Sequence, residues 1–249
     1  MIDIKKTKKK LIPYMEGFFY EKPKHFDALR MVDYNATRDK KNYFGFKRKI
    51  IYTKIIDLTC TPDELLAQFR KNTKYEIKRA EKEGIKFAIE SNLDTFLCFY
   101  NSFAESKKQY KEVPPLKRND FECLTSYLII TKAVFENEIL VMHSYLIDKD
   151  IKRVRLLNTS SLFRHEHNSQ KKCLIGRANR FLHFQDMIYF RNEGFEIYDM
   201  GGYAHNTKDK EKQKISEFKD SFGGELIEES AYTSLPLYIC REIIKLIGK

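Results

Sequence analysis

Hydrophobic residues recur along the chain at two spacings, one typical of strands and one typical of helices. Alternate residues are apolar in segments such as 85–90, whereas apolar residues return every three or four positions in segments such as 174–192. These patterns predict strands over residues 49–58, 85–90, 133–135, 139–148, 151–159, 195–200 and 226–233. They predict helices over residues 62–83, 93–110, 118–132, 174–192, 210–221 and 236–247.

Local signals mark the ends of several of these elements. Thr61 is placed to cap a helix whose first residue is Pro62, and the glycines at 84 and 194 stop two helices. Polar turns at 136–138 and 148–150 join three successive strands into an antiparallel meander. The order of elements indicates an α/β (α+β) fold, in which a mixed sheet with this meander carries helices on both faces.

Charge is unevenly distributed along the 249 residues. Residues 1–54 hold 15 Lys/Arg against 6 Asp/Glu, so most of the net charge of +11 lies there. We therefore expect a basic N-terminal extension at 1–54 that packs on or leads into a domain at 55–249. Such a face attracts phosphates, which leaves tRNA, nucleotide-linked precursors and peripheral contact with an anionic membrane open as partners. Alternatively, the basic residues of this segment only keep a solvated tail soluble and bind no partner.

Composition limits the other classes of site. The five cysteines are scattered and form no CxxC pair, so we expect no disulfide framework and no metal site. The N-terminus lacks the apolar core of a signal peptide, and no apolar run approaches the roughly 18–20 residues of a membrane span. The sequence therefore indicates a cytoplasmic protein.

Three stretches together resemble the FemAB-like branch of the GNAT superfamily of acyltransferases, which includes the peptidoglycan bridge aminoacyltransferases. They are RKNTKYEIKRAEKEGI at 70–85, GRANRFLH at 176–183, and YDMGG at 198–202 followed by Ile215, Phe218-Lys219 and SFGG at 221–224. The resemblance covers about residues 55–225. It implies a single GNAT-like domain whose central strands splay apart.

The resemblance also implies a reaction, in which a free amine attacks an activated carbonyl without forming an enzyme-bound intermediate. The protein then has to align donor and acceptor, stabilise the oxyanion and accept a proton. Lys219 matches the lysine that stabilises the tetrahedral intermediate in the family. Phe218 would offer a flat face to the donor's terminal base. An ordinary amphipathic helix, with Phe218 in the core and Lys219 in solvent, is the competing interpretation.

The remaining candidate residues would bind substrate. Asp199 ends a strand before Gly201 and Gly202, where the backbone can approach a ligand or turn tightly. A basic cluster on the first helix, which a solvated helix face also explains, is the first group. A second group lies at the position of the family's phosphate contacts, but lysine replaces the family's arginine there, so bidentate phosphate recognition does not follow. These residues are Lys74, Lys78 and Arg79 in the first group, and Lys107, Lys108 and Tyr110 in the second.

Two enzymatic functions are open, and they differ in the acyl donor, which is either aminoacyl-tRNA or acyl-CoA. Acetyl-CoA enzymes hold pyrophosphate on a glycine-rich loop at a helix N-terminus, but the comparable stretch here, 170–178, has one glycine at the wrong spacing. The first hypothesis is therefore aminoacyl transfer from tRNA to the amine of a peptidoglycan precursor. Transfer from acyl-CoA to an amino sugar of a surface polysaccharide is the second. A non-catalytic nucleic-acid- or membrane-binding module is the third. Either donor would be a substrate, and we expect no resident cofactor; a homodimer stays open.

Overall fold

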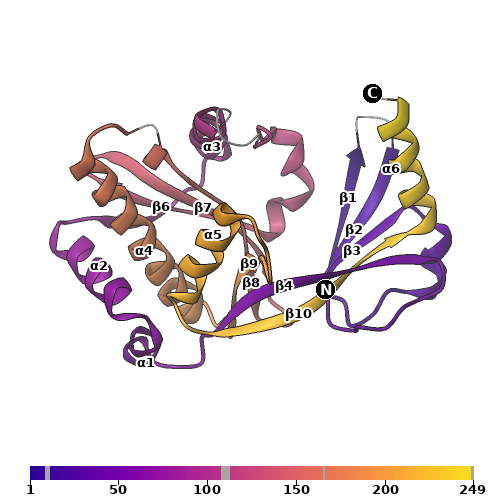
Figure 1. The fold of residues 1–249 in the computed structure, drawn as a ribbon, viewed down its shortest axis with the longest axis horizontal. Coiled ribbons are helices and arrows are strands. Elements are labelled where there is room, and N and C mark those ends of the chain that lie inside the picture. The colour runs from indigo at the N-terminus through magenta and orange to yellow at the C-terminus, as the bar shows by residue number, and fades with distance from the viewer. Residues whose placement is uncertain (9–11, 108–112, 165, 248–249) are drawn as a thin grey trace. The chain divides into compact units, whose positions relative to one another are not determined.

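The computed structural model describes residues 1–8, 12–107, 113–164 and 166–247. Contacts within the chain define two compact units (Figure 1). The first unit contains Met1–Thr53, Gly202–Thr207 and Leu226–Lys249, and the second contains Lys54–Gly201 and Lys208–Glu225. The first unit thus combines the expected N-terminal extension with a C-terminal segment.

The second unit is a mixed sheet covered by helices. Its strands follow the order β4-β9-β8-β7-β6-β5. They are β4 (Phe46–Asp57, shared with the first unit), β5 (Lys86–Ile89), β6 (Leu128–Phe135), β7 (Glu138–Asp148), β8 (Arg153–Ser161) and β9 (Ile197–Gly202). The helices are α1 (Pro62–Gln68), α2 (Lys71–Lys82), α3 (Leu93–Lys107), α4 (Ser169–Asn192) and α5 (Lys210–Asp220), with short 3₁₀ turns η2 (Arg118–Asp120), η3 (Glu122–Tyr127) and η4 (Leu162–Arg164).

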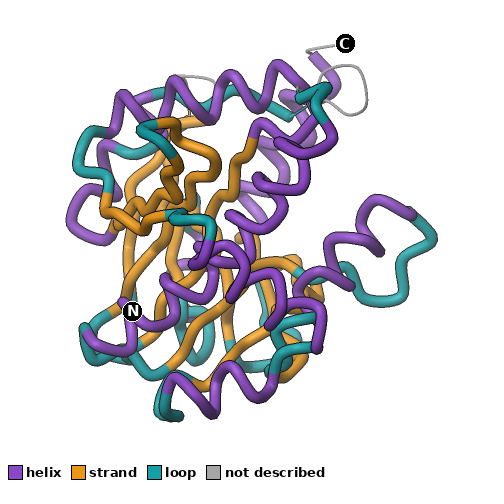
Figure 2. The backbone as a smooth tube through the Cα atoms, turned by 90° about the vertical axis from the view of Figure 1, so that its left-hand side faces the viewer, coloured by secondary structure: helices purple, strands orange, loops and turns teal. Residues whose placement is uncertain are grey.

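The predicted meander is confirmed, because β6, β7 and β8 pair antiparallel in sequence. Side chains alternate across a strand, so the two faces of β7 meet different partners. His143 and Tyr145 contact Asp186 of α4, whereas Met142 and Leu146 are buried on the other face, where α3 contacts β7 and β8. The fold class predicted from the sequence, a mixed sheet with helices on both faces, is therefore correct. The helices and strands can be followed after a quarter turn in Figure 2.

Two predicted helices are wrong in extent or type. The helix expected over 62–83 is interrupted at Phe69 and Arg70, where the chain is extended and the Arg70 amide donates to the Ser221 carbonyl. Because of this break, the Phe69 side chain points into the hydrophobic core. The helix expected over 118–132 is instead two 3₁₀ turns followed by β6. Residues 128–130 are Leu, Ile and Ile, whose side chains pack well on a pleated surface, and they pair with β7.

Helix ends follow the predicted chemistry. Thr61 and Glu64 form a reciprocal capping box at the start of α1, and Gly84 and Gly194 stop two helices at positive φ. Helix α4 begins earlier than expected because Asn168 caps it, accepting hydrogen bonds from the amides of residues 170 and 171. Residues 169–173, which precede the predicted helix 174–192, are therefore helical as well.

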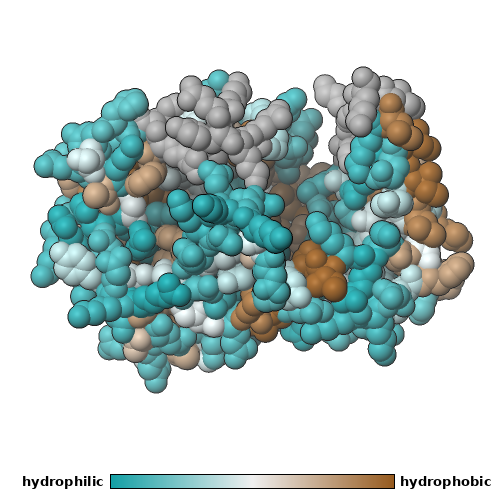
Figure 3. Space-filling view, viewed as in Figure 1, coloured by the Kyte–Doolittle hydropathy of each residue, from teal (hydrophilic) through white to brown (hydrophobic). Residues whose placement is uncertain are grey.

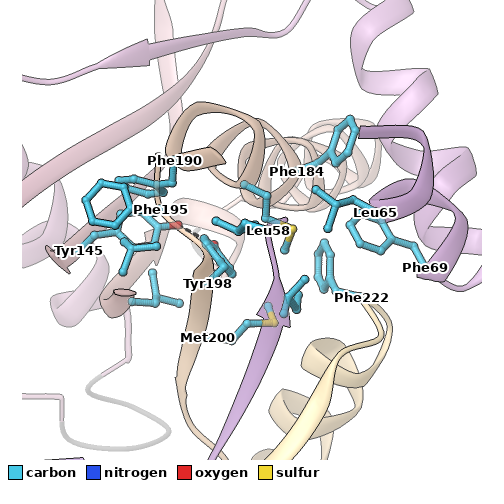
Figure 4. Close-up of a cluster of buried hydrophobic side chains, with 14 of the residues drawn as sticks. Leu58, Leu65, Phe69, Tyr145, Phe184, Phe190, Phe195, Tyr198, Met200 and Phe222 are labelled. Atoms are coloured by element: carbon cyan, nitrogen blue, oxygen red, sulfur yellow. Dashed lines mark hydrogen bonds between the residues drawn. The ribbon is translucent and has the colours of Figure 1, made fainter. Parts of the chain in front are cut away.

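The core of the second unit lies between α4 and the central strands. Phe69, at the break after α1, meets the rings of Phe184 and Phe222 edge to face. Leu58 and Leu65 belong to the same cluster, which is shown in Figure 4. All are buried. Each such side chain contributes roughly 1.5–3 kcal/mol through removal from water. This packing fixes α4 and α5 against β9, which positions the site described below.

The first unit is a smaller sheet with one helix. Its strands follow the order β1-β2-β3-β10-β4, and residues 1–50, which the sequence did not resolve into elements, supply three of them. The elements are β1 (Ile2–Lys8), β2 (Ile12–Phe18), a 3₁₀ turn η1 (His25–Leu29), β3 (Val32–Thr37), β10 (Glu225–Ser234) and α6 (Leu235–Ile247). Among the helices in the described ranges, none combines the length and hydropathy needed to cross a membrane.

Candidate functional site

Asp199 occupies the last paired position between the parallel strands β8 and β9. It lies opposite Arg155 in the register and is completely buried. Its Oδ2 accepts hydrogen bonds from Arg153 Nη2 at 2.5 Å and Arg155 Nη1 at 2.7 Å. Its Oδ1 accepts from the Gly201 amide at 2.8 Å. Two guanidinium groups thus neutralise a carboxylate that holds the backbone at the end of β9.

A glycine is required at position 201 by the backbone geometry near the end of β9. Its φ of +72° is unfavourable for residues with a side chain, and an added Cβ would lie 2.8 Å from the Leu156 carbonyl oxygen. Gly202 differs, since a Cβ there would meet nothing within 4 Å. Of the two glycines singled out in the sequence, only Gly201 therefore has a steric reason to be glycine.

Lys219 lies in the last turn of α5, a helix capped at its start by Asp209. Its side chain is buried, and its Nζ donates a hydrogen bond to the Gly201 carbonyl at 3.2 Å. Burial lowers the pKa of Lys219 to about 8, with Asp199 opposing the shift and Arg155 adding to it. The group is mostly an ammonium at neutral pH, held in a dry setting where its charge acts strongly on a nearby oxyanion.

Phe218, the neighbour of Lys219, is half-buried against the core. Its ring lies 5.6 Å from that of His183 and 5.2 Å from that of Phe222, between centroids. The Arg180 guanidinium lies over the Phe218 ring at 5.3 Å, and Arg180 Nε is buried without a hydrogen-bond partner. Burial lowers the pKa of Arg180. A cation stacked on an aromatic face with a spare donor is suited to an anionic ligand group.

A buried hydrogen-bond network lies beneath this site. Asp186 of α4 accepts hydrogen bonds from Tyr145 at 2.5 Å and interacts with His143 Nδ1 at 2.8 Å. The Tyr145 hydroxyl also meets the Tyr198 hydroxyl at 2.8 Å, and Tyr198 in turn meets His183 Nδ1 at 2.8 Å. The network therefore runs from Asp186 to the ring that packs against Phe218.

Burial shifts the pKa values of Tyr145, Tyr198 and His183 in this network. Desolvation raises the pKa values of Tyr145 and Tyr198 well above 10, so both keep their protons. Desolvation lowers the pKa of His183 well below its usual value, and the neighbouring His143, Lys219 and Arg180 lower it further. A neutral His183 therefore faces the cations of the site without adding to their repulsion.

The same network contains a candidate metal cluster. Ligand atoms of His143, His183 and Asp186 all lie within 4.8 Å of one another, and Asp186 Oδ1 is buried without a partner. Hydrogen bonds occupy His143 Nδ1 with Asp186, His143 Nε2 with Asn179, and His183 Nδ1 with Tyr198. These bonds account for the arrangement without an ion, and the expectation of no metal site stays a prediction.

The basic residues of α2 have separate partners. Lys74 Nζ donates to the Ala67 carbonyl at 2.8 Å and so caps the end of α1, while Arg79 pairs with Glu83 at 2.9 Å. Lys78 is exposed. Lys108 and Tyr110, together with the side chain of Lys107, lie outside the described residues. Substrate roles for these six residues stay predictions.

The start of α4 bears on the choice of donor. Residues 170–178 lie inside the helix, so they form no phosphate-binding loop, and Asn168 occupies the amides of residues 170 and 171. A pocket beside this helix start is lined by Glu83, Glu136 and Glu138 as well as Lys171 and Arg177. Three carboxylates make it a poor site for a pyrophosphate.

Several residues of the site were not predicted from the sequence. Arg153 and Arg155 are two residues apart on β8, so their side chains lie on the same face of the strand. Two arginines on one face of a central strand indicate a carboxylate partner, and this is the only sequence signal that could have predicted them. Arg180 lies within the stretch 176–183 but shows its role only when α4 packs beside α5. Residues 143 and 145 belong to β7, 186 to α4 and 198 to β9, and no spacing in the sequence indicates that these three elements meet.

No family model matches the chain, and no curated protein matches its sequence. A crystal structure of FemX superposes with a TM-score of 0.67 at 14% identity, covering 99% of this chain and 86% of FemX.

Two further solved structures are related more distantly. L-PGS from Bacillus licheniformis gives a TM-score of 0.56 at 14% identity, covering 88% of this chain and 73% of that one. The C-terminal domain of a putative lysylphosphatidylglycerol synthetase from Agrobacterium fabrum gives 0.54 at 11% identity, covering 86% and 70%. The chain therefore shares its fold with FemX and with these two synthetase structures, which is the fold that the resemblance to the FemAB-like branch implies.

Proposed function

We propose that this protein is an aminoacyltransferase, which moves an amino acid from charged tRNA to a free amine of a peptidoglycan precursor. The precursor would be linked to a nucleotide or a lipid, and a tRNA donor would place the reaction in the cytoplasm. The amine nitrogen attacks the ester carbonyl carbon, the carbon–oxygen bond to the tRNA ribose breaks, and the amine loses a proton as the amide forms. The ribose hydroxyl leaves with a proton.

The observation that carries this proposal is the placement of Lys219. Its ammonium is buried and directed to the end of β9 by the bond to the Gly201 carbonyl. The tetrahedral intermediate would place its oxyanion near Nζ, where a desolvated positive charge is most effective. Asp199 and the two arginines of β8 would act as positioning residues that hold the end of β9 in place.

Phe218 and Arg180 supply a second part of the proposed site. The Phe218 ring would stack on the terminal base of the donor, since stacking tolerates any base. Arg180, whose Nε is a buried donor without a partner, would receive an anionic group such as a donor phosphate. Acceptance of such a group would satisfy a polar atom that is otherwise costly to bury.

The choice of tRNA over acyl-CoA rests on the start of α4. A CoA pyrophosphate needs free amides at a helix N-terminus, but the Asn168 side chain occupies those of residues 170 and 171. The FemX-like fold supports the same choice. Another structural neighbour is the C-terminal domain of a putative lysylphosphatidylglycerol synthetase, whose name includes a phospholipid, so a lipid-linked acceptor is consistent with this fold.

A binding experiment tests the donor. Labelled total tRNA, uncharged, is titrated with the purified protein in a filter-binding assay at several salt concentrations, and acetyl-CoA is tested in parallel by calorimetry. The proposal expects tRNA binding that weakens as salt rises and no binding of acetyl-CoA. Arg180→Gln is expected to weaken binding of tRNA. Binding of acetyl-CoA alone would move the protein to the acyl-CoA-dependent class.

A further inference from the structure

A group of protruding apolar side chains occurs on the first unit. Phe44 is 100% exposed, Leu29 88%, Phe26 87% and Leu246 77%. Ile239 and Ile243 of α6 are also exposed. We call these six residues the apolar face. Isolated exposed apolar residues are common, but a concentration of them usually marks an interaction surface.

Backbone contacts bring the segments of the apolar face together. An added Cβ on Gly45 would lie 2.6 Å from the Cβ of Ala28, so the turn that carries Phe44 lies directly against η1. The Leu235 amide, which starts α6, donates to the Gly45 carbonyl at 2.8 Å. Helix α6 also contacts η1. The turn, η1 and α6 therefore form one continuous surface.

Helix α6 is attached by its other side. Leu237 is fully buried, and Arg241 Nη2 donates to Asp33 of β3 at 2.9 Å. Ile239, Ile243 and Leu246 follow one another at helical spacing on the exposed side, and Figure 3 shows the resulting brown band along α6. The helix is thus anchored to its sheet and still presents an apolar stripe outward.

Positive charge surrounds these side chains. Residues 22–30 and 40–49, which carry Phe26, Leu29 and Phe44, hold eight Lys/Arg against one acidic residue, Asp27. Asp27 is buried and bonded to Tyr34. The whole first unit holds 17 Lys/Arg against 9 Asp/Glu, a net charge of +8. A partner for this face must therefore be both apolar and anionic.

We propose that the apolar face docks on the surface of an anionic lipid bilayer. The protruding side chains enter the boundary between headgroups and acyl chains, and the lysines and arginines beside them attract the acidic headgroups. Nucleic acid would match the charge, but it offers no environment for aliphatic side chains such as Leu29 and Leu246. If the proposed function holds, docking would bring the protein to lipid-linked substrates.

Vesicle sedimentation tests this inference with the full-length protein. Vesicles of phosphatidylcholine alone are compared with vesicles containing 30% phosphatidylglycerol, in the absence of tRNA and precursor, so the result does not depend on the proposed reaction. We expect binding only to anionic vesicles, weakened by salt. The triple variant Phe26→Ser, Phe44→Ser, Leu246→Ser is expected to lower the partition coefficient roughly tenfold or more, since three apolar side chains no longer leave water.

A matched control removes exposed apolar groups elsewhere. Ile89→Ser with Phe163→Ser, on the second unit, is expected to leave vesicle binding unchanged. Circular dichroism checks that both variants fold. The inference is overturned if the triple variant binds vesicles as the wild type does, or if binding ignores lipid charge. It is also overturned if the triple variant instead loses self-association or tRNA binding while vesicle binding stays intact.

Discussion

Lys219 Nζ donates a hydrogen bond to the Gly201 carbonyl oxygen across 3.2 Å, joining the last turn of α5 to the end of β9. This contact places a cation beside Gly201, the one of the two β9 glycines that must be glycine on steric grounds. It also gives the buried ammonium a partner, since burial otherwise favours the neutral amine and lowers its pKa to about 8. The contact therefore links the chemistry of the site to the stability of the fold.

Replacing Lys219 with methionine should separate activity from stability. Below pH 8 the lysine is charged in both the folded and unfolded states, and its desolvation destabilises the folded protein. Lys219→Met should therefore abolish transfer yet raise the free energy of unfolding by about 1–3 kcal/mol at pH 7. Denaturant unfolding measures this change. Lys214→Met, exposed on the same helix, should change neither property.

The stability gain of Lys219→Met should depend on pH in a defined direction. Between about pH 8 and the pKa of an unfolded lysine, the unfolded wild type binds more protons than the folded one, so wild-type stability rises with pH. The difference between variant and wild type should shrink over this window. A difference that is constant from pH 7 to pH 10 would show that the lysine is not desolvated as described.

The transfer rate should decrease at alkaline pH, because Lys219 deprotonates there. The proposed role requires the ammonium, so the transfer rate should fall above about pH 8. In Lys219→Arg, any remaining activity should show no such fall, because arginine stays charged. Initial rates between pH 6 and pH 10 measure the profile. A wild-type rate that continues to rise through pH 9 would contradict the assignment.

The two glycines after Asp199 should respond differently to alanine. Gly201→Ala forces a side chain into a left-handed conformation and against the Leu156 carbonyl, and should cost about 1–3 kcal/mol in unfolding free energy. Gly202→Ala has open space and should change stability by less than about 0.5 kcal/mol. Thermal unfolding of the pair provides the comparison. Equal losses would refute the steric argument.

The buried network should be a source of stability. Tyr145→Phe removes the hydroxyl that joins Asp186 to Tyr198, leaving buried polar groups without a partner, and should cost about 1–3 kcal/mol. Tyr127→Phe, at the surface, should be neutral within about 0.5 kcal/mol. Urea titration distinguishes the two. Unchanged stability in Tyr145→Phe would mean that water replaces the missing bond.

The sequence predicted the second unit well because its signals are local. The capping box at Thr61, the glycine stops and the turns of the meander each act within a few residues. The helix predicted over 118–132 failed because that interpretation ignored pairing with β7, a contact between distant segments. No strands were predicted over most of residues 1–50 for a similar reason. One of the strands there, β3, pairs with β10 some two hundred residues away.

The candidate site was predictable only in part. Lys219, Asp199 and Gly201 came from a motif and do lie together. Arg180 and the network around Asp186 depend on how α4 packs against the sheet and α5, and no periodicity encodes that packing. Individual residues with a chemical signature were therefore found, whereas the groups that surround them required the fold.

Transfer of a labelled amino acid tests the central claim most directly. Total tRNA charged with radiolabelled amino acids is incubated with the protein and a nucleotide- or lipid-linked muropeptide precursor, and labelled precursor is separated by chromatography. Labelled acetyl-CoA serves as the alternative donor in a parallel reaction. The account predicts label on the precursor from tRNA, absent with Lys219→Met and present with Lys214→Met. Label that arrives from acetyl-CoA alone, or transfer that survives in Lys219→Met, would contradict it.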